Sequence, residues 1–124
     1  MPDTTPETTL QSTPHTGRHA FLYTTFPDES TARAAARAMV EARVVACANI
    51  FPAMRAVYRY QDRIAEAAET AVIFKLPDDR RDAAARLLRQ NHPYETPVVA
   101  FLDVTADAAT AAWLLAETRA PAGG

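Results

Sequence analysis

The densest group of polar and aromatic side chains in the sequence is His92-Pro93-Tyr94-Glu95. An imidazole in such a group can bind a metal ion, or it can act as a general base with Glu95 as its partner. A structural role is the competing interpretation, because a histidine near a helix C-terminus interacts favourably with the helix dipole and a following proline stops the helix. The four residues alone leave both interpretations open.

Two further side chains carry chemistry of their own. Cys47 is the only cysteine, and its thiol needs a nearby base to become a nucleophile; in an apolar stretch it is more typical of a buried, inert thiol. Lys75 is the only lysine, and at the end of a strand it can bind an anion or remain solvated or ion-paired. The lone cysteine excludes an intrachain disulfide and a multi-cysteine zinc cage, and it fits a reducing compartment.

The composition excludes several other functions. Glycine occurs only at positions 17, 123 and 124, so neither a phosphate-binding glycine loop nor a G-x-S-x-G nucleophile elbow can be built. A net charge of -2 disfavours nucleic-acid binding, and the segment 70–76 lacks the paired aromatic residues of an RNA-binding sheet. No apolar run reaches the roughly 18 residues of a membrane span, and no signal peptide is recognisable. We therefore expect a cytoplasmic protein that contacts neither membrane nor nucleic acid.

The chain divides into one folded unit and two tails. Residues 1–18 are rich in Thr and Pro and poor in bulky apolar side chains, which predicts a disordered N-terminal tail. Residues 120–124 predict a flexible C-terminus. The intervening residues 19–119 are expected to form a single domain.

Hydrophobic periodicity predicts four strands and three helices in this domain. A first helix, capped by Asp28 or Ser30, continues to about Glu41. The other elements are strands at 19–26, 44–60 (bent near Pro52), 64–76 and 96–104, and helices at 78–91 and 108–119, the last burying Ala111, Ala112 and Leu115 with Trp113 or Leu114. The order β-α-β-β-α-β-α predicts an α+β, ferredoxin-like βαββαβ sandwich with an extra C-terminal helix.

The second and third strands form a hairpin that is too long for its own domain. The 17 residues of 44–60 span about 56 Å, whereas a compact domain of this size is only about 33 Å across. An overhanging hairpin that carries Val57, Tyr58 and Tyr60 exposes strand edges and apolar surface, and association usually removes such surface from solvent. The geometry therefore predicts an oligomer built through the long hairpin.

Five short motifs in the same order resemble the CutA family of divalent-cation tolerance proteins. They are TTFPDE at 24–29, ARVVACANIFP at 42–52, VYRYQDRI at 57–64, IFK at 73–75 and HPYETP at 92–97. The resemblance implies a tight homotrimer joined through the long hairpin, without enzymatic activity and with a part in divalent-cation tolerance. It also implies copper as the bound cation and an architecture similar to the PII-type signalling proteins.

The ligand region of the family differs in this chain. Thr24 and Phe26 stand in the stretch where relatives can carry a cysteine, and Asn91 stands where the copper pattern has a second histidine. His92 is then the one predicted metal ligand. Small-molecule or metal binding is expected in clefts between subunits, with the ligand-binding residues Cys47, Lys75, Tyr94 and Glu95.

Two alternatives to a metal-tolerance function stay open. One is a PII-like signalling module that binds a small anionic metabolite between subunits. The other, a small enzyme that uses His92 and Glu95 as acid and base, is the weakest, because no set of nucleophile, base and oxyanion donors can be assembled from the sequence.

Overall fold

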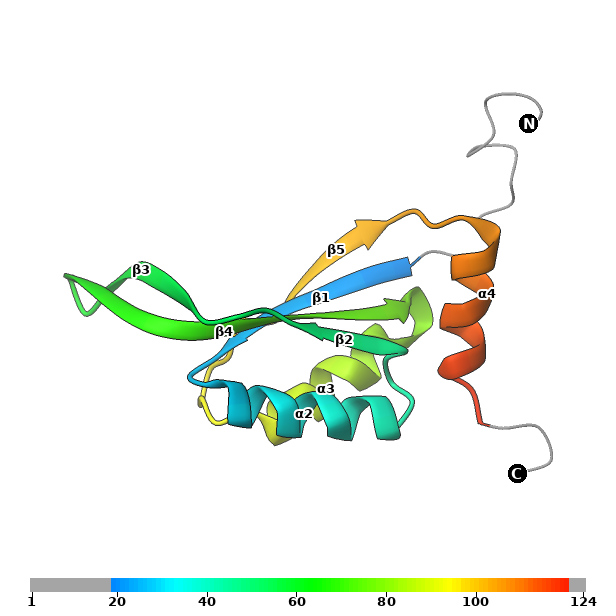
Figure 1. The fold of residues 1–124 in the computed structure, drawn as a ribbon, viewed down its shortest axis with the longest axis horizontal. Coiled ribbons are helices and arrows are strands. Elements are labelled where there is room, and N and C mark those ends of the chain that lie inside the picture. The colour runs from blue at the N-terminus through cyan, green and yellow to red at the C-terminus, as the bar shows by residue number, and fades with distance from the viewer. Residues whose placement is uncertain (1–18, 121–124) are drawn as a thin grey trace, which may run out of the picture.

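The computed structural model describes residues 19–120. Its elements are β1 (His19–Phe26), α2 (Glu29–Glu41), β2 (Cys47–Ile50), β3 (Met54–Tyr60), β4 (Arg63–Pro77), the short 3₁₀ helix η1 (Asp78–Arg80), α3 (Arg81–Asn91), β5 (Ala100–Val104) and α4 (Ala108–Glu117) (Figure 1). Apart from Ala120, the two predicted tails lie outside the described residues.

The five strands form one antiparallel arrangement. The order is β2-β4-β1-β5, and β3 pairs with the N-terminal part of β4. Helices α2 and α3 lie side by side against one face, while α4 stands at one end of the sheet (Figure 1). When β2 and β3 are counted as one strand position, this is the predicted α+β, ferredoxin-like fold with an added helix, and the prediction is confirmed.

The core lies between the sheet and the two helices. Alternate residues of β1 and β4 point toward the helices and are fully buried, among them Leu22, Phe26 and Phe74. The facing residues of α2 are mostly alanines, whose small side chains let the helix pack closely on the sheet. The residues between them, such as Phe21 and Lys75, therefore lie on the opposite side of the sheet, which we call the outer face.

Aspartates cap two of the helices. Asp28 Oδ1 accepts a hydrogen bond from the Thr31 N–H at 2.8 Å and so begins α2, which decides between the two expected caps. Asp107 Oδ1 accepts from the Thr110 N–H at 2.9 Å at the start of α4. In α4, Ala111 and Leu114 are buried as expected, but Ala112 is exposed, so its predicted burial was wrong. At a spacing of 3.6 residues per turn, the face set by 111 and 114 turns Ala112 outward.

The predicted long strand at 44–60 is two strands. Both β2 and β3 pair with β4, but residues 51–53 between them have no strand geometry. Pro52 lacks an N–H, so it cannot donate to the ladder; only the Phe51 N–H still reaches β4, at 2.9 Å from the Ala71 carbonyl oxygen. The bend near Pro52 was predicted correctly, and the interruption was missed. The continuous member of the hairpin is β4, with 15 residues.

The last strand is also shorter than predicted. It begins at Ala100, and residues 92–99 form a loop between α3 and β5. Two prolines, Pro93 and Pro97, remove backbone donors from this segment, which limits its ability to join a sheet.

The hairpin of β3 and β4 projects beyond the helical layer (Figure 1). Its ladder runs from Met54 opposite Glu69 to Tyr60 opposite Arg63. At the tip, Gln61 and Asp62 have φ angles of 51° and 63°, as a tight type I′ turn requires.

Candidate functional site

His92 ends helix α3, and its imidazole is held by two hydrogen bonds. Nε2 lies 2.8 Å from the Thr25 carbonyl oxygen in β1, and Nδ1 lies 3.1 Å from the backbone nitrogen of Tyr94. A carbonyl can only accept and a backbone N–H can only donate, so both contacts are satisfied by the neutral ring with its proton on Nε2. In this arrangement neither ring nitrogen has a free lone pair.

The surroundings of the ring favour the same neutral state. His92 stacks on Phe26 with the ring centres 4.3 Å apart and the planes 14° from parallel. Burial lowers the pKa of His92, and this effect exceeds the opposite influence of the Thr25 carbonyl and of the negative charge on Glu69. We therefore expect an uncharged imidazole at neutral pH.

Tyr94 connects this ring to the base of the projecting hairpin. Its hydroxyl donates to Glu69 Oε2 at 3.1 Å, and its ring lies 5.0 Å from the ring of His92. Burial, and then the hydrogen bond to Glu69, raise the pKa of the tyrosine hydroxyl. We call His92, Phe26, Tyr94 and Glu69 the His92 cluster.

Sequence reasoning missed Glu69 as a member of this cluster. The residue lies 25 positions before Tyr94 in the chain, and only the tertiary structure brings it near. Glu95, which the sequence suggested as the partner of His92, is exposed and makes no hydrogen bond or ion pair with the rest of 19–120.

Cys47 and Lys75 lie together in a second place. They are opposite one another in the ladder of β2 and β4, so their side chains share the outer face of the sheet. Lys75 Nζ lies 5.8 Å from the centre of the Phe21 ring on the neighbouring strand. Phe21 is four residues from Thr25 along β1, which corresponds to about 13 Å. The five site residues predicted from sequence therefore fall into two groups, and Cys47 is not beside His92.

The side chains around His92 do not fit a copper ion within one chain. Copper(II) prefers several nitrogen and oxygen ligands, yet between His19 and Ala120 no three His, Cys, Asp or Glu side chains lie close enough to hold a metal. Thr24 is fully buried, Phe26 offers only a ring, and the Asn91 amide already donates to the Leu87 carbonyl oxygen at 2.9 Å.

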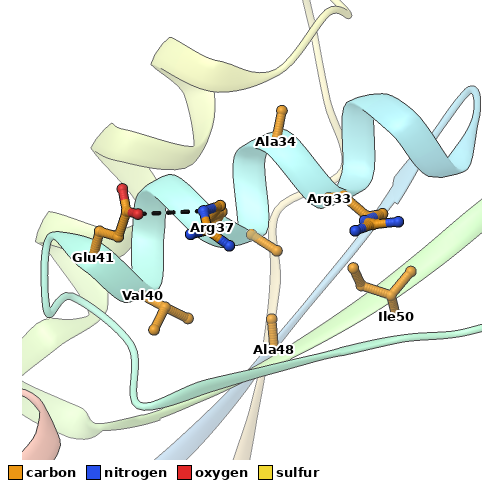
Figure 2. Close-up of a pocket in the computed structure, with 8 residues that line it drawn as sticks. Arg33, Ala34, Arg37, Val40, Glu41, Ala48 and Ile50 are labelled. Atoms are coloured by element: carbon orange, nitrogen blue, oxygen red, sulfur yellow. Dashed lines mark ion pairs between the residues drawn. The ribbon is translucent and has the colours of Figure 1, made fainter.

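A groove lies between α2 and the edge strand β2 (Figure 2). It has a volume of about 550 Å³, with apolar walls that include Val40, Ala48 and Ile50. Arg33 and Arg37 point over it, and Arg37 pairs with Glu41 at 3.4 Å (Figure 2). An apolar groove beside an open strand edge is typical of a protein-contact surface. The sequence did not indicate it, because the two walls come from separate elements.

Comparison with known proteins agrees with this architecture. The profile of one protein family, described as CutA1 divalent ion tolerance protein, matches residues 20–117. The chain belongs to the CutA1 family. The family predicted from the motifs is thus confirmed.

Relatives of this chain within the CutA1 family occur in several organisms. A divalent-cation tolerance protein CutA of Thermotoga maritima is 37% identical over 83 residues, which are 67% of this chain and 81% of the relative. Protein CutA of Homo sapiens is 34% identical over 88 residues, or 71% of this chain and 49% of the human protein.

Solved CutA1 structures share the fold. The crystal structure of CutA1 from Ehrlichia chaffeensis has a TM-score of 0.81 at 30% identity and covers 85% of this chain and 99% of its own. CutA1 from Oryza sativa has a TM-score of 0.80 at 26% identity, with 86% and 99% covered. Over the described part of the chain, no helix is both long and apolar enough to cross a membrane.

Proposed function

We propose that this chain is a homotrimeric, non-enzymatic protein of divalent-cation tolerance. The observation that carries the proposal is the match of the CutA1 family profile to nearly the whole folded part, residues 20–117. Relatives covered over most of their length bear the name divalent-cation tolerance protein. A copper-sensitive strain that lacks its own CutA1 gene should regain growth in millimolar copper when it expresses this chain. Failure of complementation by well-expressed protein would contradict the role.

The proposed trimer is supported by strand edges left open in the single chain. Strand β2 is one edge of the sheet, and the groove of Figure 2 lies beside it. In the part described, residues 63–69 of β4 pair only with β3, so the hairpin offers backbone groups along both sides. Val57, Tyr60 and Ile64 on the hairpin are 62–64% exposed. Pairing between copies would satisfy these edges and cover the apolar side chains.

The subunit number can be tested by native mass spectrometry. We expect a trimer for the unchanged protein and mostly monomer for the Val57→Glu/Ile64→Glu double variant, because two buried carboxylates oppose association. Arg86→Glu, an exposed change on α3, is the matched control and should remain trimeric. A monodisperse monomer of the unchanged chain at micromolar concentration would contradict the trimer.

Copper enters the proposal only as an ion shared between subunits. His92 would have to exchange one of its two hydrogen bonds for the metal, and further ligands such as Cys47 or Glu95 would come from another copy. With equimolar Cu(II), the trimer should then retain a whole number of ions and the monomeric double variant none. Equal copper retention by both proteins would contradict a shared site.

The absence of enzymatic activity is proposed from the arrangement of the candidate groups. His92 is neutral with both nitrogens engaged, and Cys47 lies in the other group, too far away for His92 to act as its base. Catalytic turnover that is lost in His92→Gln while the trimer stays intact would overturn this proposal.

The cytoplasm is the proposed location, and the lone Cys47 is compatible with its reducing conditions. A relative from Archaeoglobus fulgidus is described as periplasmic, so location needs its own test. Cell fractionation should recover the chain with cytoplasmic markers.

A PII-like module for an anionic metabolite is the second candidate. It is favoured by Lys75, a partly exposed cation on the outer face that has no ion-pair partner among residues 19–120. Saturable thermal stabilisation by a nucleotide or organic acid, without stabilisation by metal, would favour this candidate over metal tolerance.

A further inference from the structure

A second cavity lies at the end of the sheet where α4 stands. It has a volume of about 470 Å³, within the range of small-molecule sites. The walls come from the outer face of β1, β4 and β5 and from α4, and they include Phe21, Lys75, Val104, Thr110, Trp113 and Leu114. The His92 cluster lies toward the opposite end of β1, so this pocket is separate from it.

Among the described residues that line the pocket, Lys75 is the one cation. Lys75 is the only lysine of the chain, and in the described part its ammonium contacts the Phe21 ring rather than a carboxylate. A partly buried ammonium over an aromatic ring is a favourable position from which to bind an anion. Asp107, the one acidic residue among the described residues of the wall, accepts the Thr110 N–H at the start of α4.

The rest of the pocket is mainly apolar and aromatic. Phe21 and Trp113 provide ring surfaces, and Trp113 is 41% exposed although its neighbour Leu114 is buried. An exposed tryptophan next to a second aromatic ring can sandwich a flat, apolar group. Thr105 and Thr110 add hydroxyl groups at the rim.

We propose that this pocket binds a small aromatic monocarboxylate, with the carboxylate on Lys75 and the ring between Phe21 and Trp113. The one cation among the described lining residues matches one negative charge. Asp107 in the wall opposes a polyanion such as a nucleoside triphosphate, which needs several cations or a phosphate loop. This proposal rests on the second candidate function, for which it names the ligand class that Lys75 would bind, and it needs no metal.

The probe for the test is benzoate, titrated into the full-length protein with tryptophan fluorescence as the readout. Trp113 is the only tryptophan, so its fluorescence reports on this pocket alone. We expect a saturable change with benzoate and a much weaker one with the neutral analogue benzamide. Lys75→Met should weaken benzoate binding by about tenfold or more, because a charge-assisted hydrogen bond is lost. Arg86→Met, which removes an exposed cation on α3, should bind benzoate as the unchanged protein does.

A second measurement keeps the result independent of folding defects in the variant. The protein without substitutions is methylated with ¹³C on its lysine, and Lys75 then gives the only side-chain dimethyl-lysine NMR signal. Benzoate should shift this signal along the same saturation curve as the fluorescence. An unsaturable response, an unshifted lysine signal, or equal affinity in a folded Lys75→Met protein would each overturn the proposal. Complementation of copper tolerance tests the metal role separately. Benzoate binding can therefore fail while complementation succeeds, and complementation can fail while benzoate binds.

Discussion

His92 is the chemically most suggestive residue of the sequence, and the structure gives it a defined structural role. Its two hydrogen bonds tie the end of α3 to β1 and to the following loop, and its ring packs flat on Phe26. A ring that is fixed in this way is a positioned neutral group, and any metal must displace one of the two hydrogen bonds.

The depressed pKa of His92 predicts how stability depends on pH. The native ring resists protonation, whereas the unfolded ring takes up a proton near its ordinary pKa of about 6.5. The unfolded state therefore binds more protons, so stability is full above about pH 6.5 and falls as the pH drops through that value toward the lower native pKa. Urea unfolding from pH 8 to pH 5 measures the free energy of unfolding of the unchanged protein and of His92→Gln. The difference between the two pH profiles isolates His92, because the other titrating groups contribute equally to both.

The expected outcome is a shallower loss of stability for His92→Gln below pH 6.5. Parallel pH profiles for the two proteins would show that His92 titrates alike in both states, contrary to the packing described. Arg86→Gln serves as the control and should follow the unchanged protein.

His19 presents the opposite situation at the start of β1. Its side chain is 1% exposed, and neither ring nitrogen has a hydrogen-bond partner among residues 19–120. A buried polar group without a partner costs stability. We expect His19→Leu, of similar volume, to leave the free energy of unfolding unchanged or to raise it by about 1 kcal/mol. A loss of more than that in urea unfolding at pH 7 would mean that the imidazole makes a favourable interaction.

Among the elements, the projecting hairpin departs most from ideal local geometry. Gln61 and Asp62 occupy the left-handed region at its tip, where glycine and asparagine are favoured. Asp62→Gly should raise the free energy of unfolding by about 0.5 to 1 kcal/mol, since it relieves this conformational cost. Thermal unfolding measures it, and Asp62→Ala, which should be neutral or destabilising, is the control. An unchanged melting temperature for Asp62→Gly would show that the turn carries no strain.

The sequence allowed most of the elements to be predicted, and the reason is local. The aromatic and β-favouring residues of 19–26 and the helical spacing around Ala32, Ala36 and Met39 are each properties of one segment. The break at 51–53 and the late start of β5 were missed because they depend on which backbone groups a partner strand still reaches.

The site residues were less predictable for the same reason. Cys47 and Lys75 are far apart in the chain, and only strand register makes them neighbours. The same applies to Glu69 beside Tyr94 and to the pocket between Lys75 and Trp113. Residue types can nominate candidates, whereas their grouping is a property of the tertiary structure.

For the whole molecule, the proposed trimer predicts that thermal stability depends on concentration. If unfolding and dissociation are coupled, mass action raises the melting temperature as protein concentration rises. We expect the melting temperature to increase between 1 and 100 μM for the unchanged chain, whereas the Val57→Glu/Ile64→Glu variant should show a lower and constant value. Scanning calorimetry over that range measures both. A concentration-independent melting temperature of the unchanged chain would indicate that association does not support the fold.

The sequence separation between paired strands also bears on how the chain folds. The ladder of β3 with β4 joins residues close in sequence, from Tyr60 and Arg63 at the tip to Met54 and Glu69, whereas β1 must find β4 and β5 across 44 residues or more. Short loops close fastest, so the hairpin is expected to form first during refolding. The chain then displays its apolar, open-edged hairpin before the domain behind it is complete. Refolding yield should therefore fall with rising concentration, and rapid dilution should favour native assembly over aggregation.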